Sequence, residues 1–270
     1  MTGHAHVRFA VKEGATRLAG LDQASPLRVL FPRSGTGEPP LAAVTTISGG
    51  LVGGDRLDMS VTLGANAKAV AVGQAAEKVY RSTGADSVVD IDLQAGPDSW
   101  LEWLPQETIL FDGARLSRRT RIAADPTARI MAGECVVFGR LARGEVIRRG
   151  SVRDSWAVRR GGRLVWADAL KVDGEIIEKL DAPVGFGGAR AYATALYIGP
   201  DAPEHLERAK ELTGDCGTVR AGATCLHDIL VARWLSADPL ALRGAFERFW
   251  KEIRRTAGGL PASLPRLWYV

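Results

Sequence analysis

The chain has 270 residues, of which 46% are hydrophobic and 24% charged, and its formal net charge is +4. This length can bury a sizeable core in one large domain or two small ones. No apolar run is long enough for a membrane helix, and three scattered cysteines exclude a disulfide framework or a four-cysteine zinc site. The first residues lack an apolar signal core, so we expect a cytoplasmic protein.

Arginine supplies most of the positive charge of the chain. Its planar guanidinium suits contacts with acidic protein partners, although a GC-rich genome would also encode arginine often. The chain has no arginine-rich helix, no aromatic-interleaved basic motif and no zinc-finger spacing, so we expect no nucleic-acid partner.

The start of the chain carries two of its four histidines, His4 and His6. If Met1 is removed, the new amine, two backbone amides and the His4 imidazole could form a square-planar site for Cu(II) or Ni(II), with His6 as a weak axial contact. Short patterns of this kind arise easily by chance, so the site is a hypothesis.

Residues 1–200 have the pattern of a β protein. Short alternating runs such as "HVRFAV", "RLDMSVTL", "SVVDIDLQ" and "RIMAGECVVF" recur with Gly, Pro and Asp turn signals between them. Regular short strands without intervening helices favour stacked sheets, a barrel or a β-solenoid over βαβ units. In residues 87–95, Asp90 and Asp92 share one face and Ile91 and Leu93 the other, which predicts a half-buried strand.

The glycine-rich stretch "ISGGLVGGDRL" spans residues 47–57. Its two glycine pairs allow sharp turns or close backbone approach, and the following pattern is β, which favours a structural corner over an anion-binding nest. Asp55 lies where the chain leaves this corner.

Acidic residues cluster near the predicted strand ends, above all in "LPQETILFDGARLSRRTRI", residues 104–122. Buried carboxylates are costly unless they are paired, hydrated or metal-bound. They could be salt-bridged strand faces, or they could line a wet interior through which a hard or borderline cation passes. The chain has no GxxxxGK[ST] phosphate loop and no GxSxG nucleophile elbow.

The pattern changes after residue 200. "APEHLERAKELTG" predicts a short helix that ends near Gly214, and "ATCLHDILVARWL" has apolar residues at helical spacing. Asp238 and Pro239 begin a third helix that stops at Gly258 and Gly259, with an apolar face that includes Phe246 and Trp250 and a basic remainder that includes Arg254. An extended apolar tail follows. We therefore expect a single domain with a β body over residues 1–200 and a helical segment with a docked tail over residues 201–270.

Five separated segments resemble the UreD family of urease accessory proteins, called UreH in some systems. They are "ISGGLVGGDRL", "QAAEKVYRSTG", "LEWLPQETILFDGARLSRRTRI", "VVFGRLARGE" and "PRLW", in this order between about residue 40 and the end of the chain. Two details depart from the family pattern: Ser48 stands where proline is usual, and "VGQAAE" replaces a threonine-rich lead.

The resemblance implies a non-catalytic maturation factor with a mainly β fold of stacked sheets. Such a protein binds apo-urease and UreF, through which it meets the GTPase UreG, and it helps to deliver Ni²⁺ to the dinuclear urease site. It implies no tightly bound cofactor, only transient Ni²⁺, and no membrane partner. Weak carboxylate and water contacts suit the passage of an ion better than strong ligands do.

On that reading, the nickel-path candidates are Asp55, Ser82, Glu102, Glu107 and Glu134. The expected supporting residues are Tyr80, Arg81, Arg115, Arg140 and Glu145, of which Arg115 and Arg140 should fix the path carboxylates. The candidates for partner contacts are Trp250, Leu267, Trp268 and Tyr269, with Trp268 and Tyr269 exposed; alternatively, the tail closes the core of the protein itself. Two other functions stay open: an adaptor without metal traffic, and a β-rich hydrolase with a carboxylate pair.

Overall fold

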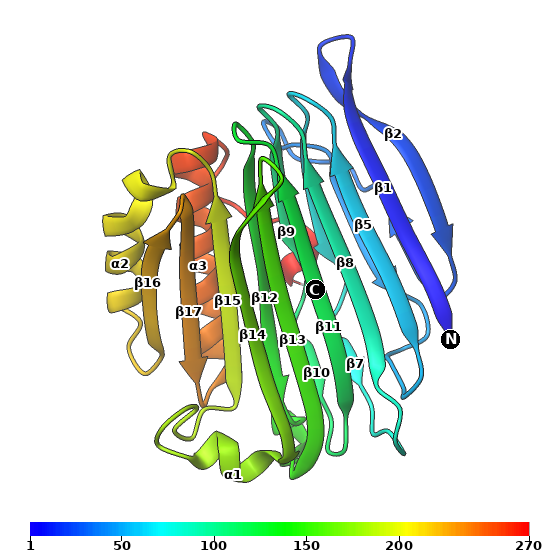
Figure 1. Cartoon of the computed structure of the whole chain (residues 1–270), viewed down its shortest axis with the longest axis vertical. Coiled ribbons are helices and arrows are strands. Elements are labelled where there is room, and N and C mark those ends of the chain that lie inside the picture. Colours follow the sequence, from blue (N-terminus) through cyan, green and yellow to red (C-terminus); the bar gives the residue numbers. More distant parts are fainter. Residues whose placement is uncertain (270) are drawn as a thin grey trace.

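The computed structural model describes residues 1–269 as two stacked β-sheets with helices on one side (Figure 1). The last residue of the tail lies outside the described residues. The first sheet has the strand order β14 (Arg163–Glu175), β13 (Arg149–Arg160), β11 (Arg115–Ala124), β8 (Ser87–Ala95), β5 (Arg56–Leu63), β1 (Thr2–Lys12) and β2 (Ala15–Ala24).

The second sheet has the order β16 (Arg220–Leu226), β17 (Ile229–Ser236), β15 (Ala191–Ile198), β12 (Arg129–Phe138), β9 (Trp100–Leu104), β6 (Lys68–Gly73), β4 (Leu41–Thr46) and β3 (Leu27–Leu30). Two short strands, β7 (Glu77–Val79) and β10 (Thr108–Leu110), pair with each other, and β10 also pairs with β12.

The central part of the chain crosses from one sheet to the other with almost every strand. As a result β5, β8, β11 and β13 pair in parallel in the first sheet, and β4, β6, β9 and β12 do so in the second. Parallel neighbours are separated in sequence by one or two strands of the opposite sheet, which gives the body its solenoid-like character. The expectation of stacked sheets is confirmed.

Alternation along the strands builds the core between the sheets. In β8, Val89, Ile91 and Leu93 are buried while Asp90 and Asp92 face outward, as the sequence pattern predicts. A second core lies between the second sheet and the helices α2 (Leu206–Gly214) and α3 (Pro239–Gly258). The structure thus has two interiors, one between the sheets and one between the second sheet and the helices.

The third helix has the predicted boundaries. The Asp238 side chain accepts a hydrogen bond from Leu240 N, and Gly259 caps the end with φ 61°. Its apolar face is buried, but Arg254 is buried with it, so the expectation that Arg254 lies on the exposed remainder is wrong. A short helix α1 (Ile176–Asp181) and the 3-10 turns Leu141–Arg143, Ala202–His205 and Arg266–Tyr269 complete the elements.

The predicted helix in "ATCLHDILVARWL" is wrong, because this stretch forms the β16–β17 hairpin. Its turn residues His227 and Asp228 have φ of 49° and 61°, the conformation of a tight hairpin turn. Strand β17 is buried on both faces, so its apolar residues do not alternate, and a continuous apolar run of this kind cannot be distinguished from a buried helix by periodicity. Residues 201–270 therefore contain strands as well as helices.

Candidate functional site

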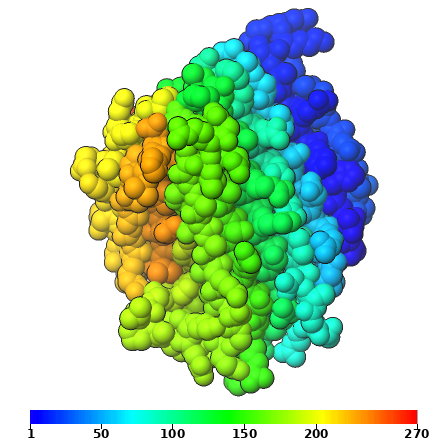
Figure 2. Space-filling view, in the orientation of Figure 1, coloured from blue at the N-terminus to red at the C-terminus, as the bar shows by residue number. Residues whose placement is uncertain are grey.

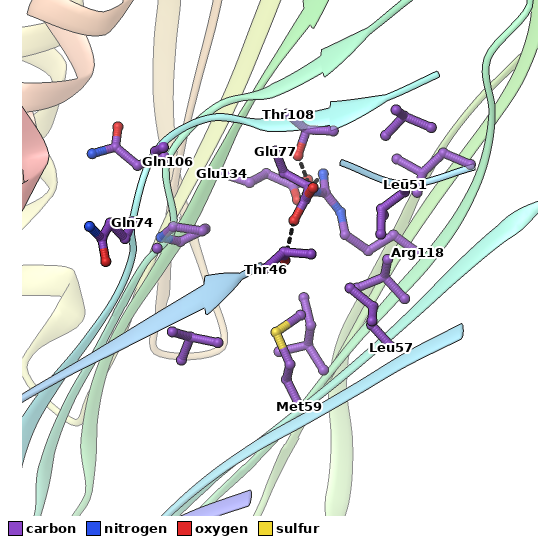
Figure 3. A pocket seen from close by; sticks show the side chains of 18 of the residues that line it. Thr46, Leu51, Leu57, Met59, Gln74, Glu77, Gln106, Thr108, Arg118 and Glu134 are labelled. Atoms are coloured by element: carbon purple, nitrogen blue, oxygen red, sulfur yellow. Dashed lines mark hydrogen bonds and ion pairs between the residues drawn. The ribbon is translucent and has the colours of Figure 1, made fainter. Parts of the chain in front are cut away.

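A cavity of about 80 Å³ lies between the two sheets. Apolar side chains form much of its wall, and among its polar lining residues are Glu77, Thr108, Arg118 and Glu134 (Figure 3). Glu77 comes from β7, Arg118 from β11 and Glu134 from β12, so both sheets contribute. In Figure 3 the carboxylates of Glu77 and Glu134 point to the same region as the Arg118 guanidinium.

Arg118 lies between two buried carboxylates. Its Nε donates to Asp154 Oδ1 at 3.1 Å and its Nη1 to Thr108 Oγ1 at 2.9 Å, and its Nη2 pairs with both Asp154 and Glu134. Trp156 Nε1 donates to the other Glu134 oxygen, Oε1, at 3.0 Å. One guanidinium thus serves two carboxylates, which leaves this cluster one cation short of neutrality if both acids are ionised.

The pKa values of Glu134 and Asp154 shift in opposite directions. Burial raises the pKa of Glu134 well above its ordinary value of 4.5, beyond what Arg118 offsets. Burial acts on Asp154 too, but the bidentate contact with Arg118 and a hydrogen bond from Glu134 lower the pKa of Asp154. Of the two acids, Glu134 therefore holds a proton more readily, and Asp154 is the acid that stays ionised more readily beside Arg118.

Glu77 is the second acidic group on the cavity. Burial raises its pKa, although a hydrogen bond from Thr46 Oγ1 at 2.5 Å favours the ionised form. The cavity thus contains two carboxyl groups that bind protons more tightly than exposed ones do. A divalent cation could displace those protons and be released again when they return.

Glu102 lies in the other interior, beneath α3, and is fully buried. Trp100 Nε1 donates to its Oε1 at 2.9 Å, Trp250 Nε1 to its Oε2 at 2.8 Å, and Arg254 Nε to its Oε1 at 2.8 Å. Glu102 thus fixes α3 to the second sheet through both of its oxygens, and it is not among the residues that line the cavity.

The side chain of Glu107 also has a fixed partner, because it forms an ion pair with Arg243 of α3. Arg243 further donates to Gln106 Oε1 at 2.9 Å and to the Trp268 carbonyl, and Gln106 Nε2 donates to the Leu267 carbonyl at 2.7 Å. These contacts hold the C-terminal tail on the second sheet, and Gln106 also lines the cavity.

Asp55 and Ser82 lie at the glycine corner. Asp55 is buried, and its Oδ2 accepts from Val52 N at 2.9 Å while Oδ1 pairs with the N-terminal ammonium. A Cβ at Gly53 would lie 2.1 Å from Ser82 Oγ, and one at Gly50 would lie 2.6 Å from the Tyr80 ring. The corner therefore needs glycine because Tyr80 and Ser82 pack directly on its backbone, as a structural corner requires.

Comparison with known proteins gives a consistent result. A family model described as UreD urease accessory protein matches residues 1–269. The chain is 44% identical to a urease accessory protein UreD of Magnetococcus marinus, over 99% of this chain and 94% of that protein. It is 42% identical to the one of Methylobacterium sp. strain 4-46, over 96% and 90% of the two chains.

The chain belongs to the UreD family. The match confirms the resemblance carried by the five motifs and extends it to the first 40 residues, which contain the strands β1, β2 and β3.

Of the five nickel-path candidates in this UreD chain, only Glu134 lines the cavity. The supporting residues also lie elsewhere: Arg115 pairs with Asp86 at 2.8 Å, Arg140 with Glu145 at 2.9 Å, and Arg81 with Asp112 at 3.1 Å. The expectation that Arg115 and Arg140 fix the path carboxylates is wrong. Arg118, Arg243 and Arg254 pair with Glu134, Glu107 and Glu102 instead.

Asp154 was missed in the sequence, and Arg118 was not chosen as a supporting residue, although a signal for it was present. In "RLSRRTRI" the alternation places Leu116, Arg118 and Ile122 on the same buried face, so one arginine faces the core. An inward arginine requires an inward carboxylate, and the structure supplies two.

The tail candidates divide into buried and exposed residues. Trp250 and Trp268 are buried, so the expectation that Trp268 is exposed is wrong. The Trp268 ring stacks on Phe246, with ring centroids 5.9 Å apart, and the Arg243 guanidinium lies 4.3 Å from its centroid. Tyr269 is 57% exposed, as expected, and Leu267 is half-buried.

His4 and His6 lie on the outer face of β1, beside Asp22 and Asp58. The square-planar site stays a hypothesis, and it would require the start of β1 to open, because this strand pairs with β2 and β5 on its two sides. Within residues 1–269, no cluster of three or more His, Cys, Asp or Glu side chains has an arrangement that could hold a metal ion. None of the helices in the same range is both long and apolar enough to cross a membrane.

Proposed function

We propose that this chain is a urease maturation factor that binds apo-urease and UreF, meets UreG through UreF, and passes Ni²⁺ toward the dinuclear nickel site of urease during GTP-dependent activation. Its relatives are named urease accessory proteins, and the match covers almost the whole of both chains. In this role the chain itself makes and breaks no covalent bond.

The observation that best supports nickel passage is the cavity between the sheets. The residues that line it can supply carboxylate, hydroxyl and amide oxygens as ligands for Ni²⁺. Among the described residues, no histidine or cysteine lines it. Imidazole and thiolate bind nickel strongly, so a path without them can release the ion. The raised pKa values of Glu77 and Glu134 add to this reversibility, because each cation must compete with a proton.

The size of the cavity also suits the passage of an ion. Small-molecule sites have volumes of about 300–1,000 Å³, whereas a water molecule occupies about 30 Å³. A cavity of about 80 Å³ therefore has room for an ion with a few waters and is small for an organic substrate.

We further propose that the exposed end of the tail and the outer face of α3 take part in partner binding. Tyr269 is exposed, and its hydroxyl donates to Glu247 of α3 at 2.6 Å. Tyrosine at the rim of a helix face is a common interface residue. A UreF pull-down with Tyr269→Ala, compared with the solvent-facing substitution Glu204→Ala on the 3-10 turn before α2, tests this surface; equal binding of UreF by both variants would remove Tyr269 from the interface.

The function as a whole is tested by reconstitution. Apo-urease, UreF and UreG are combined with nickel, bicarbonate and GTP, with and without this chain, and urease activity and bound nickel are measured. We expect a stable complex and activation that depend on the chain. Equal activation without it would contradict the proposed function.

Nickel passage is tested in the same assay with Glu77→Gln. We expect the complex to assemble and the nickel content of urease to fall, whereas the exposed control Glu178→Gln leaves it unchanged. Full loading with Glu77→Gln and Glu134→Gln combined would favour an adaptor without metal traffic.

A further inference from the structure

Strand β2 is a free edge of the first sheet. It pairs with β1 on one side, and no strand of the described residues pairs with its other side. Half of its residues are exposed, including two large apolar ones, Leu18 at 44% and Leu21 at 40%. A long edge strand with exposed leucines is a template for pairing with another strand, and proteins usually protect such edges.

A bulge determines which way the side chains of β2 point. Gly20 pairs with Arg8 and Leu18 with Phe9, so Ala19 is an extra residue in the ladder. Leu18 and Leu21 therefore lie opposite Phe9 and Val7, both buried residues of the inner face. Without the extra residue, two leucines three positions apart would point to opposite faces.

The same bulge places two opposite charges on the outer face. Arg17 lies opposite Ala10 and Asp22 opposite His6, and these two β1 residues share the outer side of the sheet. Arg17 is exposed and forms no ion pair with any residue of the described chain. Asp22 is 73% exposed at its side chain, and its one ion pair within residues 1–269 is with His4, whose contact lowers the pKa of Asp22.

From this arrangement we propose that β2 pairs antiparallel with β2 of a second copy, about a two-fold axis between Ala19 and Gly20. In this register Arg17 faces Asp22 of the second copy, and Leu18 faces Leu21. At the axis, Ala19 of each copy faces Gly20 of the other. Two residues that lie directly opposite each other in an antiparallel pair have their side chains on the same face of the sheet. Because of the bulge, Arg17 and Asp22 share the outer face and Leu18 and Leu21 share the inner face, so both pairs meet this condition.

The two-fold axis repeats each contact, as in an isologous dimer. The first sheets of the two copies then form one continuous sheet, and Leu18 and Leu21 of each copy cover the same leucines of the other copy. Strand β2 lies at the edge of the molecule farthest from α2 and α3 (Figures 1 and 2), so the proposed pairing leaves the helical side free for other partners. The pairing does not depend on the proposed role in urease maturation.

Charge exchange tests the register. The full-length chain is studied by sedimentation equilibrium from about 1 to 500 µM, because a single strand pair is a small interface with an affinity in the micromolar range or weaker. We expect a monomer–dimer equilibrium that Arg17→Asp or Asp22→Arg weakens by about tenfold or more, since each change turns two attractions into two repulsions. The double variant Arg17→Asp/Asp22→Arg should restore association.

A matched control uses the opposite edge of the same sheet. Leu18→Lys should abolish the dimer, whereas Leu164→Lys on β14, a leucine that is 53% exposed, should leave it intact. Thermal unfolding of each variant verifies the fold. A chain that stays monomeric at all concentrations, a double variant that does not regain association, or a β2 edge that captures a different protein instead of a second copy would each overturn the proposal.

Discussion

Glu102 and Glu134 are both buried carboxylates next to an arginine, yet their surroundings differ. Glu102 lies in the interior between the second sheet and the helices, where two tryptophans and Arg254 occupy both of its oxygens. Glu134 lies between the sheets, shares Arg118 with Asp154, and borders a cavity. Burial raises the pKa of Glu134.

The comparison shows how the role of a buried acid can be inferred from its surroundings. A carboxylate whose lone pairs are all used and which has no adjacent space stabilises the fold. A carboxylate that shares its cation with another acid and borders a cavity holds a proton more readily, and a second cation could replace that proton. On this basis we propose a structural role for Glu102 and a role in nickel passage for Glu134.

The largest effect is expected from Arg254→Ala. The change leaves Glu102 buried without its cation and frees Glu38, which also pairs with Arg254. Loss of one partner of a buried pair costs about 3–5 kcal/mol, so urea denaturation should show a loss of unfolding free energy of that order. Arg255→Ala, on the exposed side of the same helix, should change the stability little. Equal losses for the two variants would contradict the structural role of Glu102.

A smaller effect on stability distinguishes Glu102 from Glu134 directly. Glu102→Gln removes the charge that Arg254 Nε binds and should cost about 1–3 kcal/mol of unfolding free energy at pH 7. Glu134→Gln resembles the protonated acid, can still accept from Trp156, and leaves Arg118 with Asp154, so its cost should be below about 1 kcal/mol. A greater loss for Glu134→Gln in the same denaturation experiment would reverse the assignment.

The pH dependence should differ between the same variants. The folded pKa of Glu134 is raised, so its contribution to stability is complete below the ordinary value of 4.5 and is lost as the pH rises toward the folded pKa. Relative to Glu134→Gln, the wild-type chain should therefore lose up to about 1.4 kcal/mol of unfolding free energy per pH unit above 4.5. Parallel stability curves from pH 4.5 to 8 would show that Glu134 ionises normally.

Much of this fold could be predicted from local patterns. The alternation in β8, the cap at Asp238 and the glycine stop of α3 each act within a few residues, and the structure confirms them. The β16–β17 hairpin could not be recognised, because burial on both faces of β17 removed the alternation. Trp268 and Arg254 were placed on the surface because their partners, Phe246 and Glu102, become visible only in the packed chain.

The candidate site was less predictable than the fold. The sequence singled out Glu134, but the five path candidates lie in different parts of the molecule, because spacing along a chain that alternates between sheets does not measure distance across them. The alternation in β11 was the one local signal for Arg118. The partner of Arg118 across the sheet, Asp154, follows only from the parallel register of β11 and β13.

The most direct test of this account is the nickel content of urease matured with Glu134→Gln. Complexes of the wild-type chain, Glu134→Gln and the exposed control Glu178→Gln are assembled equally with UreF, UreG and apo-urease, activated, and analysed for bound nickel. The account predicts a normal complex and a clear deficit of nickel only with Glu134→Gln. Full nickel loading with that variant would contradict passage through the cavity between the sheets.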